Sequence, residues 1–251
     1  MKDNLRIALT FSGGGYRAAT FHLGALSYLH SVKVGEFTLL DHVVALSTIS
    51  GGTITGLRYM LGLSRGESVT DIFKELYTFL TDVELATVAM NNLASYEKGQ
   101  CASLIRTMAD IYNKELFKGA VLGDLMDQLD DIHICHFAAN ATDFTNGLAF
   151  RFQVTEKTGA KQEQATGYGL IGNNKIRIPR EVARHIRLSE VLACSSCFPS
   201  GFEPLVFPKD FVLGDSEEVK KFIAKTEPFG IMDGGIVDNQ GIEPILLAEQ
   251  R

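Results

Sequence analysis

Three short segments of the chain carry residues that could do acyl-transfer chemistry. They are Gly13-Gly14-Gly15, Ser50-Gly51-Gly52 and Asp233-Gly234-Gly235. A serine hydroxyl attacks an ester carbonyl when a neighbouring base takes its proton, and a carboxylate can be that base. Backbone N–H groups of glycines can bind the negative charge that develops on the carbonyl oxygen. The three segments together predict a serine hydrolase.

Ser50 follows the apolar, β-prone residues 43–46 and precedes a helix-like stretch, which is the arrangement of a nucleophile elbow. The usual elbow sequence is G-x-S-x-G, with small residues on both sides of a sharp turn between strand and helix. Gly52 supplies the second glycine, whereas Thr48 replaces the first. Two hypotheses follow: an active nucleophile, or an elbow that Thr48 distorts.

The glycine cluster after the first expected strand has three interpretations. A P-loop needs a Gly-Lys pair that this cluster lacks, which excludes nucleoside triphosphate binding. Gly13, Gly15 and Ala18 match a loose dinucleotide fingerprint. The acidic residue at the required distance is Glu36, which precedes the second strand instead of ending it. An oxyanion hole at Gly13, Gly14 and Gly15 agrees best with a serine at the end of the neighbouring strand.

Asp233 is the best-placed candidate for the base that activates Ser50. In α/β-hydrolases the histidine follows the serine and the acid along the chain. His133, His136 and His185 follow Ser50, but none lies in a loop after an acid-bearing strand end. Asp233 ends an expected strand beside two glycines that permit a tight turn. Its ordinary pKa near ~3.9 makes it a weaker base than histidine, yet it can act within hydrogen-bond reach.

The elements expected around these segments alternate between strand and helix. Hydrophobic spacing predicts strands at 5–11 and 42–49 and helices at 16–31 and 53–63, which is typical of an α/β fold with a parallel sheet. Residues 69–129 predict only helices, so we expect a helical insertion over the sheet at about 65–130. The remaining predictions are strands at 133–140, 148–154 and 229–232, helices at 184–192 and from near 243, and a mobile loop at 159–174.

Composition excludes several other classes of protein. The chain has 251 residues, 45% hydrophobic and 22% charged, with a net charge of −6 and both signs interspersed. We expect a globular protein with no nucleic-acid partner. No apolar run approaches the roughly 18 residues that span a bilayer. Residues 1–4 leave no room for a signal peptide, so we expect a cytoplasmic protein. The helix expected near Glu243 is cut by the chain end, which suggests a longer natural protein.

The four cysteines do not form a recognisable disulfide framework for a chain of this length. Cys194-Ser195-Ser196-Cys197 matches C-x-x-C, but a zinc site needs a second pair of ligands that the sequence lacks. We expect these small residues to pack tightly near the site, in a reducing compartment. We expect neither a metal nor a cofactor.

The three glycine-bearing segments resemble the signature blocks of the patatin-like phospholipases, in the family's order. Ala141-Thr142-Asp143 with Gly147, and the stretch from Ala193 to Pro199, resemble two weaker blocks. The blocks cover residues from about 5 to 245. The resemblance implies a single patatin-like domain over residues 1–251, an α/β fold whose mostly parallel central sheet is covered by helices on both faces.

For the site, the resemblance implies a dyad of Ser50 and Asp233 and an oxyanion hole at Gly13–Gly15. Arg17 matches the family's basic residue and, with Gly52, is expected to support the loop or the substrate. The implied activity is lipid acyl hydrolysis by a phospholipase A or lysophospholipase-like esterase through an acyl-serine intermediate. The implied partner is a lipid or ester substrate, met at a membrane surface. The alternative is a catalytically impaired lipid- or partner-binding module of the same fold; a nucleotide-binding oxidoreductase rests on the glycine match alone.

Overall fold

The computed structural model describes residues 5–94, 103–155 and 171–249. The strands of its central sheet are β1 Ile7–Phe11, β4 Val43–Ile49, β5 His136–Asp143, β6 Leu148–Thr155, β7 Ile171–Gly172, β8 Arg177–Ile178, β9 Leu205–Phe207 and β10 Phe229–Asp233. The strand order is β1-β4-β5-β6-β7-β8, and β10 pairs with both β5 and β9. A separate hairpin consists of β2 Lys33–Val34 and β3 Phe37–Thr38.

The strands that lead to the predicted nucleophile are parallel. β4 pairs in parallel with β1 on one side and with β5 on the other, so Ile49 lies opposite Asn140. The later pairings, of β5 with β6 and β10 and onward, are antiparallel. Because β10 pairs with the last residues of β5, Asp233 lies opposite Ala141. The ends of β4 and β10 therefore lie close together, opposite the neighbouring residues Asn140 and Ala141 of β5.

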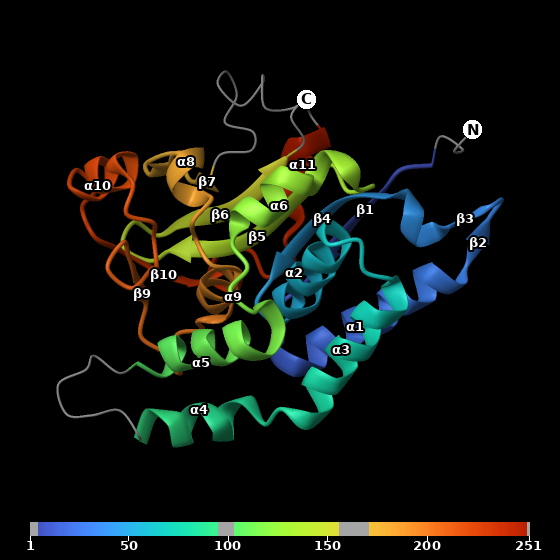
Figure 1. The fold of residues 1–251 in the computed structure, drawn as a ribbon, viewed down its shortest axis with the longest axis horizontal. Helices are drawn as coiled ribbons and strands as arrows, with labels where there is room; N and C mark the ends of the chain where they lie inside the picture. The colour runs from blue at the N-terminus through green and yellow to red at the C-terminus, as the bar shows by residue number, and fades with distance from the viewer. Residues whose placement is uncertain (1–4, 95–102, 156–170, 250–251) are drawn as a thin grey trace.

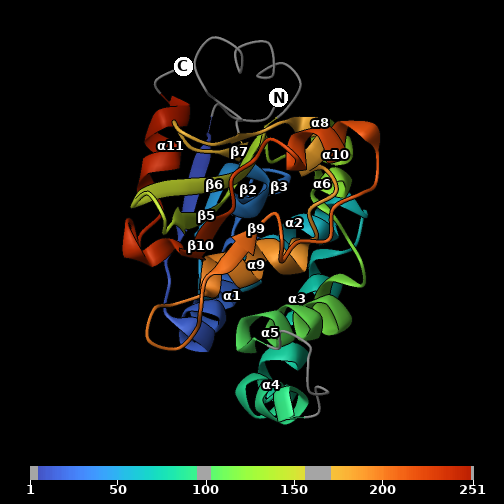
Figure 2. The same cartoon turned by 90° about the vertical axis from the view of Figure 1, so that its left-hand side faces the viewer.

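Helices lie on both faces of this sheet (Figure 1). They include α1 Gly15–Ser31, α2 Gly51–Ser64, α6 Leu122–Gln128, α9 Leu188–Ser196 and α11 Ile242–Glu249. On one face α2 packs against β4 and α6 against β6, whereas α11 packs against β1 and β4 on the other face (Figure 2). The predicted α/β class is confirmed. Because the sheet is covered on both sides, six of the seven residues of β4 are buried, as is usual for such strands.

The stretch between α2 and β5 is helical, and its described residues form none of the strands named above. It consists of α3 Val69–Asp82, α4 Leu85–Ala94, α5 Leu104–Tyr112, the π-helical turn η2 Asn113–Phe117, α6 and the 3-10 turn η3 Leu129–Asp131. In α3 the buried residues Ile72, Leu76 and Phe79 recur at helical spacing and face the body of the protein. The side chain of Ser68 caps this helix by accepting the N–H of Asp71 at 3.1 Å.

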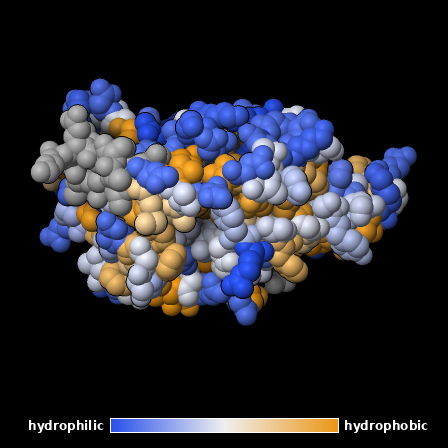
Figure 3. Space-filling view, turned by 90° about the horizontal axis from the view of Figure 1, so that it is seen from below, coloured by the Kyte–Doolittle hydropathy of each residue, from blue (hydrophilic) through white to orange (hydrophobic). Residues whose placement is uncertain are grey.

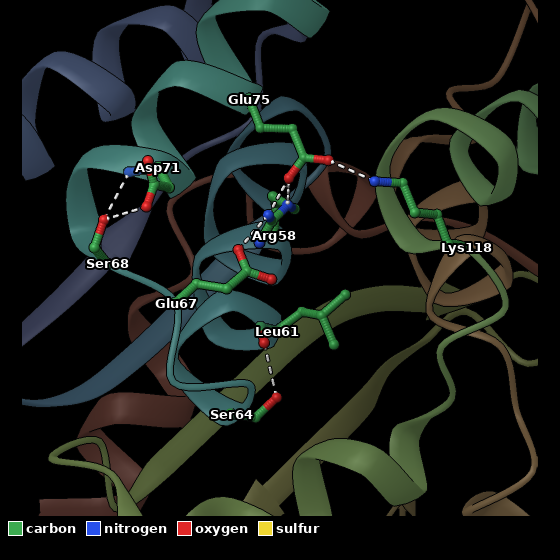
Figure 4. Close-up of polar contacts among 8 residues, drawn as sticks. All are labelled: Arg58, Leu61, Ser64, Glu67, Ser68, Asp71, Glu75 and Lys118. Atoms are coloured by element: carbon green, nitrogen blue, oxygen red, sulfur yellow. Dashed lines mark hydrogen bonds and ion pairs between the residues drawn. The ribbon is translucent and has the colours of Figure 1, made fainter.

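A charged cluster fastens this helical stretch to α2, the helix that follows the predicted nucleophile (Figure 4). The side chain of Arg58, on α2, is only 3% exposed. Its guanidinium donates to Glu67 at 2.5 Å and to Glu75 of α3, through Nε, at 2.8 Å. Glu75 also accepts from Lys118 at 3.1 Å. Arg58 and Glu75 together therefore connect α2, α3 and the residue that follows η2.

Several boundaries differ from the predictions. The helix predicted at 184–192 is α9, at 188–196, and a short helix α8 Arg180–Ala183 precedes it. The strand predicted from 133 begins at His136. Residues 159–170 of the predicted loop lie outside the described residues, and β7 follows at 171. We did not predict β7, β8, β9, the β2–β3 hairpin, the 3-10 turn η1 Leu39–His42 or α10 Glu217–Ile223, because such short elements have too few residues to show a hydrophobic period.

Candidate active site

Ser50 lies on a sharp turn between β4 and α2. Its backbone has φ 51° and ψ −120°, a region that residues other than glycine rarely adopt. Such a conformation costs about 1–3 kcal/mol and persists only where the surroundings hold it. The neighbouring chains come very close: a Cβ atom on Gly52 would lie 2.3 Å from the carbonyl oxygen of Phe11, and one on Gly51 would lie 2.1 Å from that of Gly15. The glycines after Ser50 therefore let α2 approach β1 and the glycine loop.

The glycine loop connects β1 to α1 and lies directly against Ser50. A Cβ atom on Gly13 would be 3.3 Å from the Cβ atom of Ser50. Gly14 has φ 141° and Gly15 has φ 63°, both strained for residues with a side chain. The N–H of Gly13 donates to the backbone oxygen of Asn239 at 3.2 Å, so this N–H has a partner within the protein. Gly14 and Gly15 are exposed at the N-terminus of α1, where the helix dipole favours negative charge.

Asp233 ends β10 and is only 5% exposed. Its Oδ1 accepts the N–H of Gly235 at 2.7 Å. Its own backbone is held from both sides, since its N–H donates to the carbonyl of Cys197 at 2.9 Å and its carbonyl accepts the hydroxyl of Thr142 at 2.8 Å. The carboxyl group is therefore fixed in one orientation at the end of the strand.

Burial raises the pKa of Asp233 above its ordinary value, and this is the largest effect on the group. Hydrogen bonding from the Gly235 N–H and from the Ser50 side chain opposes it and lowers the pKa. Ser50 and Asp233, distant in the sequence, therefore interact through their side chains. A carboxylate with a raised pKa is a stronger base than an ordinary aspartate, which suits proton transfer from a hydroxyl.

Comparison with known proteins identifies the family of the chain. A family model described as Patatin-like phospholipase matches residues 9–246. The chain belongs to the patatin-like phospholipase family. Its fold is also similar to that of a solved structure, human GIVD cytosolic phospholipase A2, with a TM-score of 0.57 and 15% identity over 96% of this chain. This patatin-like chain spans 43% of the length of that structure. No curated protein sequence matches it.

The three histidines that follow Ser50 in the sequence lie among residues other than Ser50 and Asp233. His133 lies beside Tyr59, with 3.4 Å between its Nε2 and the tyrosine hydroxyl. His136 begins β5, at the end of the strand that lies away from Ser50 and Asp233, and its Nδ1 is 3.1 Å from the Thr155 hydroxyl. A Cβ atom on Gly214 would lie 3.1 Å from Nδ1 of His185. Asp233 is thus the candidate base that the fold brings to Ser50.

His22, which precedes Ser50 in the sequence and had no predicted role, supports the glycine loop. Its Nε2 lies 3.1 Å from the carbonyl oxygen of Ser12, and its ring stacks on Phe11 with 4.4 Å between ring centroids. Burial lowers the pKa of His22, so the neutral ring is favoured. The sequence signal for this supporting role is a histidine seven positions after the loop, on the first turns of α1.

The side chain of Arg17 is exposed on the first turn of α1, immediately beyond the glycine loop.

Cys194 and Cys197 are buried free thiols at the end of α9. Burial raises the pKa of Cys197 to about 12 and that of Cys194 well above its ordinary value. Thiols that remain protonated are poor nucleophiles.

Among the described residues, none of the helices has the length and apolar character that crossing a membrane requires.

Proposed function

We propose that this protein is a lipid acyl hydrolase that cleaves carboxylic esters through an acyl-serine intermediate, with Ser50 as nucleophile and Asp233 as base. One observation carries the proposal: Ser50 has the strained backbone of a nucleophile elbow and a side-chain interaction with a buried carboxyl group. The glycine loop lies against the same serine. Family membership agrees with this chemistry, and we propose that residues 1–251 form one patatin-like domain with a helical insertion.

In the proposed reaction, the Ser50 hydroxyl attacks the ester carbonyl carbon while its proton moves to the Asp233 carboxylate. The N–H groups of Gly14 and Gly15 stabilise the oxyanion of the tetrahedral intermediate. The intermediate collapses, and the leaving alcohol takes the proton from Asp233. Water then gives a proton to Asp233 and attacks the acyl-serine, and the fatty acid leaves as Ser50 regains its proton.

The other predicted residues have supporting roles in this proposal. Gly13 contributes by having no side chain, since a Cβ atom there would also lie 2.3 Å from Oδ1 of Asn239. Gly52 permits the close packing of α2 on β1 described above. Arg17 is exposed beside the loop and is positioned to contact an anionic part of the substrate. We assign it no proton transfer.

Exposed apolar side chains near the dyad favour a lipid substrate. Ile236 and Val237 follow Asp233 closely and are 42% and 47% exposed. Phe198, which is 52% exposed, directly follows the residue whose carbonyl binds the Asp233 N–H. Patches of apolar surface are also visible on the face shown in Figure 3. We propose that the protein meets its substrate at a membrane surface as a peripheral protein.

Labelling with a fluorophosphonate tests the nucleophile. Wild type should be labelled and should release fatty acid from phosphatidylcholine vesicles, whereas Ser50→Ala should do neither and Asp233→Asn should be labelled much more slowly. Ser64→Ala, at the other end of α2, is the matched control, because its hydroxyl donates to Leu61 within the helix. Labelling of Ser50→Ala at the wild-type rate would refute the proposal. Vesicle binding by wild type without any turnover would instead support the binding-module alternative.

A further inference from the structure

The strained backbone of Ser50 is held by a residue from a distant part of the chain. The N–H of Ser50 donates to the hydroxyl oxygen of Ser195 at 2.9 Å. On its other side, the carbonyl of Ser50 accepts the N–H of Thr53 at 2.9 Å in the first turn of α2. The first contact is the one that crosses between elements, because Ser195 belongs to α9.

The Ser195 hydroxyl is itself fixed. It is fully buried, it donates to the carbonyl of Asn140 at 2.7 Å, and it lies 2.8 Å from the hydroxyl of Thr53. The Thr53 hydroxyl also lies 3.1 Å from the hydroxyl of Thr48. Each of these buried hydroxyls has partners, so the network stiffens the turn instead of leaving a polar group unpaired.

The same turn of α9 also holds the backbone of Asp233. Two residues after Ser195, the carbonyl of Cys197 accepts the N–H of Asp233 at 2.9 Å. The backbone N–H groups of Ser50 and Asp233 are therefore bound by two atoms of one short segment. A rigid segment that binds both residues sets the distance between them.

We propose that Ser195 is a positioning residue, and that the Ser195 hydroxyl and the Cys197 carbonyl together fix the separation of the Ser50 hydroxyl and the Asp233 carboxylate. The proposal rests on the function proposed above. Ser195 binds the backbone N–H of Ser50. It therefore acts through the nucleophile and is not itself a catalytic residue. Without the Ser195 hydroxyl, the Ser50 N–H loses its partner and the strained turn relaxes. The Ser50 hydroxyl then moves away from the Asp233 carboxylate.

The test compares Ser195→Ala with Ser196→Ala. Ser196 is the matched control because it is the next residue of α9 and its hydroxyl donates to Leu192 within the helix, at 2.8 Å. Fluorophosphonate labelling and kcat on a short soluble ester should fall by about 10- to 100-fold in Ser195→Ala, with KM within about two-fold of wild type. Ser196→Ala should keep both rates. Equal losses in the two variants would show a general structural role and overturn the proposal.

Hydrogen–deuterium exchange of peptides that contain Ser50 gives a readout that needs no activity. Exchange should be faster in Ser195→Ala than in wild type and unchanged in Ser196→Ala. If wild type is not labelled, the proposed function fails, yet this exchange still decides whether Ser195 holds the elbow. If Ser195→Ala does not fold, Thr53→Val removes a hydroxyl that contacts Ser195 and is measured in the same way. Unchanged exchange in the folded variant overturns the proposal.

Discussion

The methyl group of Thr48 lies over Gly56, one and a half turns into α2. A Cβ atom on Gly56 would be 2.3 Å from Cγ2 of Thr48, whereas its other neighbours would be at least 3.4 Å away. The bulk that Thr48 adds to the elbow is therefore matched by the absence of a side chain on the facing helix. The Thr48 hydroxyl is accommodated as well, since it donates to the carbonyl of Ala138 at 3.3 Å.

This relationship predicts a mutual dependence of two substitutions. Gly56→Ala alone should lower the free energy of unfolding by about 1–3 kcal/mol because the new methyl group overpacks the site. In a Thr48→Ser background the same change should be neutral or stabilising, since serine keeps the hydroxyl without the methyl group and alanine favours a helix by about 1 kcal/mol over glycine. Urea denaturation of the four proteins measures the coupling. An equal cost of Gly56→Ala in both backgrounds would contradict it.

The raised pKa of Asp233 predicts the acid side of the pH profile. The base must be ionised to accept the Ser50 proton, so kcat/KM on a soluble ester should rise with pH through the pKa of Asp233. That midpoint should lie above ~3.9, the value of an exposed aspartate. Initial rates across this range measure it. A profile that is flat through the acidic range would be inconsistent with Asp233 as the base.

Because its pKa is raised, ionised Asp233 lowers the stability of the folded protein at neutral pH. A carboxyl group whose pKa is raised by folding contributes stability at low pH, and this contribution is lost as pH rises through the folded pKa. Asp233→Asn should therefore raise Tm at neutral pH while activity is lost. Asp127→Asn, at a carboxyl group whose side chain is 57% exposed, is the control and should leave both unchanged. A fall in Tm of Asp233→Asn would contradict the expectation.

The charged cluster around Arg58 predicts a large effect of substituting the half-buried Glu75. Glu75→Gln should lower the free energy of unfolding by about 2–3 kcal/mol, because Arg58 is buried and would lose an ionised partner. Lys74→Gln, the adjacent residue of α3, is the control, since its ion pair with Asp71 is exposed and should contribute little. Urea denaturation measures both. Similar small effects in the two variants would mean that the cluster does not anchor α3.

Glu190, on α9, predicts a pH dependence of stability. Burial raises its pKa to about 7, although it accepts the N–H groups of Val212 at 2.7 Å and Arg187 at 3.1 Å. The folded protein therefore holds a proton that the unfolded chain releases near pH 4.5, and stability falls as pH rises from about 4.5 to 7. The loss should approach about 3 kcal/mol by pH 7 and should be absent in Glu190→Gln. Parallel stability curves of the two proteins between these pH values would contradict this prediction.

The elements that carry the candidate site could be predicted from the sequence because each has a strong local signal. The apolar run of β4 and the helical spacing of α1 and α2 predict a strand and two helices within a few residues of their observed ends. Glycine clusters mark the turns, since close approach and positive φ exclude other residues. Gly13 shows the limit, because no local pattern indicates that its N–H donates to the backbone oxygen of Asn239.

The contacts that hold the site could not be predicted in the same way. Ser195, Asn140 and Asn239 act through bonds to residues far away in the sequence, and a serine or an asparagine has no periodic signal that announces its partner. The effect of Thr48 also depends on the face of α2 that packs against it, where Gly56 has no side chain.

The sequence by itself determined the chemistry that is available: a serine on a strand-to-helix turn, an aspartate at a strand end and a glycine loop before a helix. It did so because turns, strand ends and helix starts are local properties of a few residues. Only the tertiary structure decided that these groups meet. β10 pairs with the end of β5 beside β4, and the end of α9 binds the backbone of both Ser50 and Asp233. Such pairing depends on the packing of the whole chain, which no short segment encodes.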